Sequence, residues 1–144
     1  MARAVVHLAG TAAWLSASHF HAAAVQSQAI RDLIVRYSDL LLAQTRQSVA
    51  CNALHELEAR LCRWLLQTHD CMDGDVIPLT QEFLGQMLGV RRTTVTIAAR
   101  LLQSAELIRY HRGHIQILDR KALEESACEC PTFREEPAMR PCVG

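Results

Sequence analysis

Hydrophobic positions recur every three or four residues along much of the chain, which predicts a mainly helical fold. The clearest run is a long helix over residues 25–51, where charged residues separate the apolar positions. Its apolar stripe consists of Ile30, Leu33, Ile34, Tyr37, Leu40 and Leu41. The stripe follows heptad spacing until Gln44 and Gln47 dilute it, so we expect a dimerisation helix. Packing of the stripe onto its own domain is the alternative.

A second helix is predicted over residues 52–67, with Asn52 as its N-cap. Its expected buried face is Leu54, Leu57, Leu61, Trp64 and Leu65. Residues 68–78 contain Asp, Gly and Pro, which predicts a loop.

The next stretch predicts two helices joined by a tight turn. Thr80 is placed to cap a short helix that stops at Gly89, and the following helix begins near Arg92. Arg91 and Arg92 oppose the positive end of the helix dipole, so this start costs stability unless an anion binds there. A nucleic-acid phosphate is the obvious candidate.

The two faces of this helix differ in composition. The expected core face is Val95, Ala98, Leu101 and Leu102. The outward face is Arg92, Thr93, Thr96, Ile97 and Arg100. An ordinary amphipathic helix explains this polarity, but it explains neither the uncapped basic start nor an exposed Ile97.

The period then changes from helix to strand, which predicts a β-hairpin with a two-residue turn at 112–113. In that register Tyr110 faces Ile115 and Ile108 faces Ile117. The basic side chains at the turn are His111, Arg112 and His114. Two helices followed by a hairpin form a winged helix-turn-helix, and the turn either contacts a phosphate backbone or is an ordinary solvated turn.

These residues resemble a known family. The segment LTQEFLGQMLGVRRTTVTIAARLLQSAELIRYHRGHIQILDRKAL is similar to the C-terminal DNA-binding domain of Crp/Fnr bacterial transcription regulators, and the likeness extends over about residues 26–123. It implies a homodimer joined through the long helix, with each second helix of the motif in a major groove of double-stranded DNA. RNA polymerase is a further candidate partner.

Two departures from the family pattern affect these expectations. Family members read bases through an Arg, a Glu and a second Arg; Arg92 keeps the first, but Thr93 and Ile97 replace the other two. The family's sensory β-roll should precede the long helix, and about 25 residues cannot form one. We therefore expect a truncated member or one without a sensor, in which residues 1–24 are a remnant and 122–144 an acidic tail.

The DNA contacts expected of this winged domain, residues 52–121, come from three segments. We expect them from Thr80, Gln81, Arg91, Arg92, Thr93, Thr96, Ile97, Arg100, Arg112 and His114. The rival hypothesis is a truncated paralogue whose long helix pairs with a full-length family member. No constellation with catalytic spacing is present, so we expect neither an enzyme nor a cofactor.

Charge and cysteine content alter this picture little. Residues 79–121 carry seven Lys or Arg and three Asp or Glu, a local +4 within a chain of zero net charge. Six cysteines without a CxxC pair favour reduced thiols in a cytoplasmic protein and no metal. The alternative is a metal or redox site at Cys128, Cys130 and Cys142. The start resembles a weak signal peptide that His7 interrupts, and no membrane span is expected.

Overall fold

The structure is a computed structural model that describes residues 6, 10–72 and 74–130. This part of the chain holds six helices and a three-stranded antiparallel sheet, which confirms the mainly helical winged fold. The chain divides between Arg46 and Gln47 into two compact units. Among the described residues, no helix has the length and apolar content that a membrane span requires.

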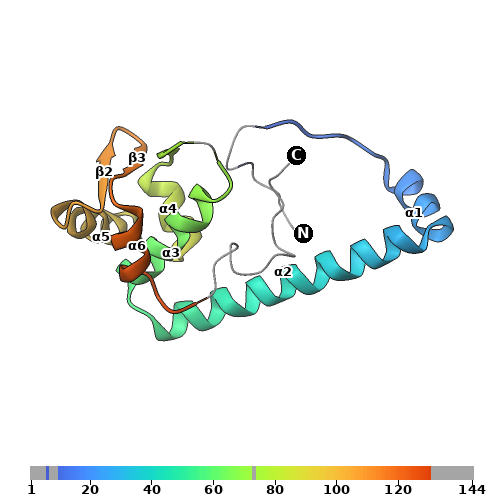
Figure 1. Cartoon of the computed structure of the whole chain (residues 1–144), viewed down its shortest axis with the longest axis horizontal. Helices are drawn as coiled ribbons and strands as arrows, with labels where there is room; N and C mark the ends of the chain where they lie inside the picture. The colour runs from blue at the N-terminus through green and yellow to red at the C-terminus, as the bar shows by residue number, and fades with distance from the viewer. Residues whose placement is uncertain (1–5, 7–9, 73, 131–144) are drawn as a thin grey trace. The chain divides into compact units, whose positions relative to one another are not determined.

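The first unit contains α1 (Ala17–Gln26) and most of α2 (Gln28–Leu54) (Figure 1). Arg31 of α2 donates hydrogen bonds to the carbonyls of Ala24 and Val25, at 2.6 and 2.7 Å, and so satisfies carbonyls at the end of α1. The predicted long helix is therefore confirmed, although it begins at Gln28.

The break after α2 was predicted at the wrong place. Helix α2 continues through Asn52 to Leu54, so Asn52 is not an N-cap, and α3 (Leu57–His69) begins after Glu56. Leu54 is 77% exposed instead of buried, because it belongs to the end of α2 and not to the core-facing helix α3. The rest of the predicted face is correct in its centre, where Leu61 and Leu65 are fully buried.

The helix-turn-helix consists of α4 (Gln81–Leu88) and α5 (Arg92–Ser104). Thr80 caps α4 by accepting the N–H of Phe83 at 3.2 Å, and Gly89 ends it with φ +67°, as the sequence predicts. The turn passes so close to α4 that a Cβ on Gly85 would lie 2.8 Å from the Val90 carbonyl oxygen. Only glycine fits there without a shift of the backbone.

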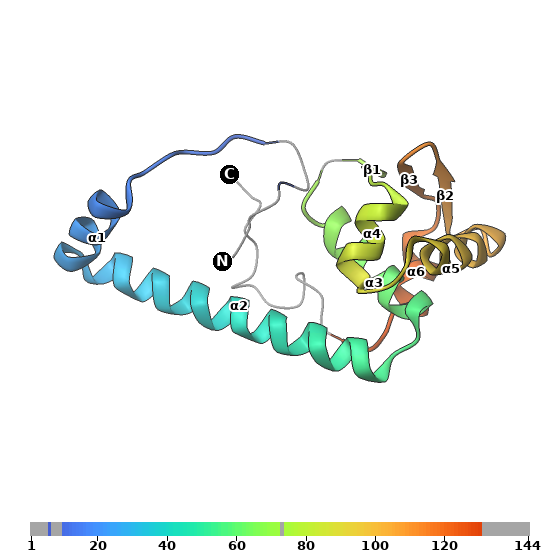
Figure 2. The ribbon, with the colours of Figure 1, turned by 180° about the vertical axis from the view of Figure 1, so that it is seen from behind.

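The sheet has strand order β1-β3-β2 and packs on one side of the hydrophobic core of the second unit (Figure 2). The predicted hairpin is confirmed: β2 (Ile108–His111) and β3 (His114–Ile117) pair Ile108 with Ile117 and Tyr110 with Ile115. The predicted loop is wrong in part, because β1 (Val76–Pro78) pairs with β3. Three residues are too few to show a strand period, and the fully buried Ile77 owes its place to the distant Ile115.

The last helix, α6 (Arg120–Ser126), packs against α3 and was not predicted (Figure 1). Asp119 caps it by accepting the N–H of Ala122 at 3.0 Å, and Leu123 is fully buried. Arg120 pairs with Asp70 at 2.8 Å, which fixes α6 to the end of α3. The predicted acidic tail therefore begins with a helix that completes the core.

Candidate nucleic-acid interface

The N-terminus of α5 carries positive charge and lacks a cap, as the sequence predicts. Arg91 occupies the N-cap position without a side-chain hydrogen bond, and the first turn contains no acidic residue. Arg91, Arg92 and Thr93 are exposed. Ser, Thr, Asp or Asn at this N-cap position would stabilise the folded protein by about 0.5–2 kcal/mol. Arg91 does not supply this stabilisation.

The outward face of α5 matches the predicted arrangement. Arg100 is exposed, and Ile97 is 60% exposed although it is apolar. One residue of the predicted core face is wrong: Leu101 is 53% exposed. At about 100° per residue, it lies about 100° from Leu102 and about 120° from Val95, which both face the core.

Thr96 links this face to the start of α4. Its hydroxyl is placed to donate to the Gln81 side-chain oxygen at 2.9 Å or to the Arg92 carbonyl at 3.0 Å. A hydroxyl has one proton and two acceptor lone pairs, so Thr96 still offers an acceptor to an outside donor. The contact fixes the first turn of α4 beside α5.

The hairpin turn lies beside the same end of α4. A Cβ added to Gly113 would lie 3.8 Å from the Thr80 methyl carbon, and His114 pairs with Pro78 just before α4. The structure therefore gathers the start of α4, the first turns of α5 and the hairpin turn. We call this set the recognition surface; its residues are Thr80, Gln81, Arg91, Arg92, Thr93, Thr96, Ile97, Arg100, Arg112 and His114.

The charged residue of the hairpin turn, Arg112, has a strained backbone conformation. Arg112 and Gly113 both have positive φ, +44° and +82°, as a type I′ turn requires. A non-glycine residue in this region costs roughly 1–2 kcal/mol, and Arg is not among the residues that favour it. The turn and the start of α5 thus both hold an exposed arginine at a position where another residue would be more stable.

The arginines of the recognition surface are free of carboxylate partners in the part of the chain that the structure describes. The ion pairs found there involve other residues, and Arg91, Arg92, Arg100 and Arg112 are all exposed. Their charge is therefore available to an external anion. The arrangement can bind a polyanion along one continuous face.

This geometry defines the chain as a winged helix-turn-helix protein. Residues 59–126 match the family model of the Crp-like helix-turn-helix domain. This segment is therefore similar to Crp-like helix-turn-helix domains, which agrees with the resemblance drawn from the sequence.

Solved structures with a similar fold include FixK2 from Bradyrhizobium japonicum, with a TM-score of 0.71 and 15% identity. A CRP-family transcriptional regulator from Thermus thermophilus gives 0.64 and 21%, and a Crp/Fnr-family regulator from Eubacterium rectale gives 0.62 and 22%. The matches cover 79%, 72% and 76% of this chain and 60%, 56% and 51% of those chains, respectively. The chain thus spans between 51% and 60% of their length. No curated protein sequence matches the chain.

Sequence reasoning missed one group of chemically active side chains. It grouped Cys128 and Cys130 with Cys142, which lies outside the described residues, and it assigned no role to Cys51 or His55. The structure brings Cys51, His55, Cys128 and Cys130 together. The signal available in sequence was weak, because the two halves of this group lie 77 residues apart.

Proposed function

We propose that this protein is a sequence-specific regulator of transcription that binds double-stranded DNA as a homodimer. The observation that carries the proposal is the uncapped start of α5, where Arg91 and Arg92 are exposed beside the start of α4 and the hairpin turn. A helix N-terminus with added positive charge is a favourable site for phosphate. A Crp-like domain supports DNA as the source of that phosphate.

Base contacts in this proposal come from the outward face of α5, lying in the major groove. Arg92 contacts a guanine edge or a phosphate, and Thr93 and Thr96 contact a base edge or a phosphate. Ile97 packs against a thymine methyl group. This contact accounts for an apolar side chain that is 60% exposed in the free protein.

Backbone contacts position the domain without reading sequence. Arg91 and Arg100 bind phosphates beside the groove, and Arg112 and His114 bind phosphate from the hairpin turn. Thr80 and Gln81 contribute through side chains and the backbone amides at the start of α4.

Dimerisation in this proposal uses the apolar stripe of α2. Leu33, Tyr37 and Leu41 are 62%, 56% and 44% exposed, so much of the stripe is available to a second copy. Two recognition helices must lie about 34 Å apart to read successive major grooves, which a monomer cannot do. The dilution of the stripe by Gln44 and Gln47 favours a dimer that dissociates readily. RNA polymerase is a further partner in this proposal, and no catalytic step is needed.

The test is selection of bound sequences from a random DNA pool, followed by sedimentation with and without the selected DNA. We expect a concentration-dependent mixture of monomer and dimer that palindromic DNA shifts to dimer by mass action. Leu40→Asp should remove the dimer and specific binding together. Val35→Asp is the matched control, since Val35 is 58% exposed and lies two residues beyond Leu33, off the heptad stripe. A wild-type chain that stays monomeric on a palindrome contradicts the homodimer and favours pairing with a full-length family member.

A further inference from the structure

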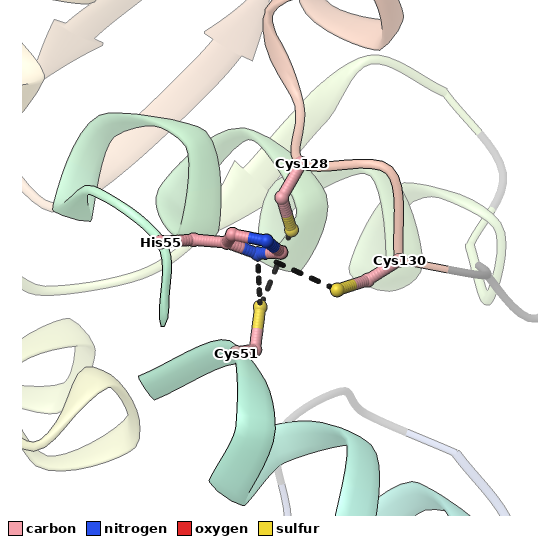
Figure 3. Close-up of side chains that lie close together, drawn as sticks. All are labelled: Cys51, His55, Cys128 and Cys130. Atoms are coloured by element: carbon pink, nitrogen blue, oxygen red, sulfur yellow. Dashed lines mark hydrogen bonds between the residues drawn. The ribbon is translucent and has the colours of Figure 1, made fainter. Parts of the chain in front are cut away.

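Four side chains with metal-binding atoms converge in the second unit (Figure 3). Cys51 lies in the last turn of α2 and His55 directly follows that helix, whereas Cys128 and Cys130 lie in the segment after α6. Their ligand atoms all lie within 4.8 Å of one another. We call this set the thiol cluster.

Local backbone structure holds each pair in place. The His55 N–H donates to the Cys51 carbonyl at 3.1 Å, which continues the helical spacing that sets residues i and i+4 on one face. The Cys128 N–H lies 3.4 Å from the Ala59 carbonyl oxygen, so the segment after α6 is bonded to the first turn of α3. Cys51 and His55, and the segment that carries Cys128 and Cys130, are thus both held where α2 ends and α3 begins.

The distances from His55 suit a tetrahedral zinc site. With Zn–S near 2.3 Å and Zn–N near 2.0–2.1 Å, ideal tetrahedral angles separate S from N by about 3.5–3.6 Å. His55 Nδ1 lies 3.6 Å from Cys51 Sγ and 3.5 Å from Cys130 Sγ. The sulfurs of Cys51 and Cys128 are 3.2 Å apart, between a disulfide bond of about 2.05 Å and a tetrahedral edge of about 3.8 Å.

The chemistry of the donors also selects the metal. Thiolates and imidazole are soft or borderline ligands that zinc prefers, whereas magnesium and calcium require oxygen ligands. The set contains four protein ligands, which is the number of a closed structural zinc site and leaves no open position for catalysis.

The cluster is largely withdrawn from solvent. Cys51 is fully buried, and the other three side chains are half-buried. Burial alone would raise the pKa of Cys51, but hydrogen bonds with His55 and Cys128 and the charge of Arg63 lower it to about 7. The pKa of Cys128 rises to about 12, through burial and its hydrogen bond with Cys51.

Arg63 supplies a complementary charge. It is 7% exposed, and its Nε has no hydrogen-bond partner within the described residues. Three thiolates and a neutral imidazole around Zn²⁺ have a net charge of −1, which a nearby buried guanidinium compensates.

We propose that Cys51, His55, Cys128 and Cys130 bind one Zn²⁺ ion as a closed structural site. The ion displaces the three thiol protons and forms three Zn–S bonds and one Zn–N bond. It ties the last turn of α2 to the segment after α6, at the start of α3. This proposal does not depend on DNA binding.

The test uses the full chain, purified under reducing conditions without chelator. Elemental mass spectrometry should find one zinc per chain, and Co²⁺ added to the metal-free protein should give the visible spectrum of tetrahedral thiolate ligation. Cys51→Ser, His55→Ala and Cys130→Ser should each weaken Co²⁺ binding by more than about 100-fold, the upper range for losses of outer-shell partners. Cys71→Ser is the matched control and should bind as wild type does.

Three results would overturn the proposal. The first is a folded, reduced wild-type chain that binds neither Zn²⁺ nor Co²⁺. The second is loss of the metal in Cys142→Ser with retention in Cys51→Ser, which would move the site elsewhere. The third is a disulfide between Cys51 and Cys128 in the purified chain, found by non-reducing peptide mapping after free thiols are alkylated, with no metal present. Because His55 and Cys130 are half-buried, their variants keep the test valid if Cys51→Ser does not fold.

Discussion

The recognition surface and the thiol cluster both lie where helices begin or end. They differ in whether their polar groups are exposed without partners or buried with partners. At the start of α5, Arg91 and Arg92 are exposed without carboxylate partners among the described residues. At the end of α2, Cys51 is fully buried and its sulfur has two polar neighbours, His55 and Cys128. The first region suits a large external ligand, and the second suits an ion that the protein encloses.

This difference has an energetic consequence. A site that awaits an external ligand leaves its charges unpaired in the free protein, so it lowers stability until the ligand binds. A site that encloses its ligand contributes the binding free energy to folding itself. Removing the ligand-binding groups should therefore raise stability in the first region and lower it in the second.

The largest expected effect is that of metal removal on folding. At a free zinc concentration about 100 times the Kd, binding stabilises the folded state by about 2.7 kcal/mol. For a domain of this size that corresponds to a fall in Tm of roughly 10–20 °C when a chelator is added. Thermal unfolding followed by circular dichroism measures it.

Two controls sharpen this measurement. Cys71→Ser should show the same fall, whereas in Cys130→Ser the chelator should have no effect. An unchanged Tm of the wild-type protein on chelation would show that the cluster does not contribute to folding.

The two regions also differ in how far the sequence could predict them. The recognition surface was predictable because its signals are local: the cap at Thr80, the stop at Gly89 and the hairpin register each lie within a few residues. The thiol cluster depends on α6, whose packing against α3 brings Cys128 to Cys51 from 77 residues away. No periodicity within one segment reports such a contact.

The same reason explains the smaller errors in the fold. Strand β1 exists because Ile77 pairs with Ile115, and a three-residue segment has no period of its own. The end of α2 was misplaced because Asn52 is a good N-cap in isolation, although the helix continues past it. In each case a tertiary contact or a neighbouring helix overrode a local preference.

The second largest effect concerns the turn that fixes α4 against α5. In Gly85→Ala the new Cβ would lie 2.8 Å from the Val90 carbonyl oxygen, and both groups belong to the backbone frame of the turn. We expect a loss of about 1–3 kcal/mol in unfolding free energy, together with weaker DNA binding. Denaturant unfolding measures the first.

Gln86→Ala, on an exposed position of the same helix, is the control and should change stability little. If Gly85→Ala were as stable as the wild type, the turn would have room that the structure does not show.

The third prediction separates base reading from phosphate contact on the recognition surface. Arg92→Ala should cost about 1–3 kcal/mol of binding to the selected DNA and relax preference at one base position. Arg100→Ala should weaken binding to all sequences alike and reduce the salt slope by about 1. Fluorescence anisotropy titrations at several salt concentrations distinguish the two. Arg46→Ala, an exposed arginine of α2, is the control; equal losses from all three variants would mean that only net charge matters.

The smallest effect tests directly whether the recognition surface lowers the stability of the free protein. Arg91→Ser removes a charge from the positive end of α5 and adds a capping oxygen, so unfolding free energy should rise by about 0.5–2 kcal/mol while DNA binding weakens. Arg91→Ala removes the charge without adding a cap, and it should recover only about 0.3–1 kcal/mol. Denaturant unfolding of the two variants therefore separates the contribution of the dipole from that of the cap. A less stable Arg91→Ser protein with intact DNA binding would mean that Arg91 stabilises the fold. Removing binding groups would then lower stability in the recognition surface as well as in the thiol cluster.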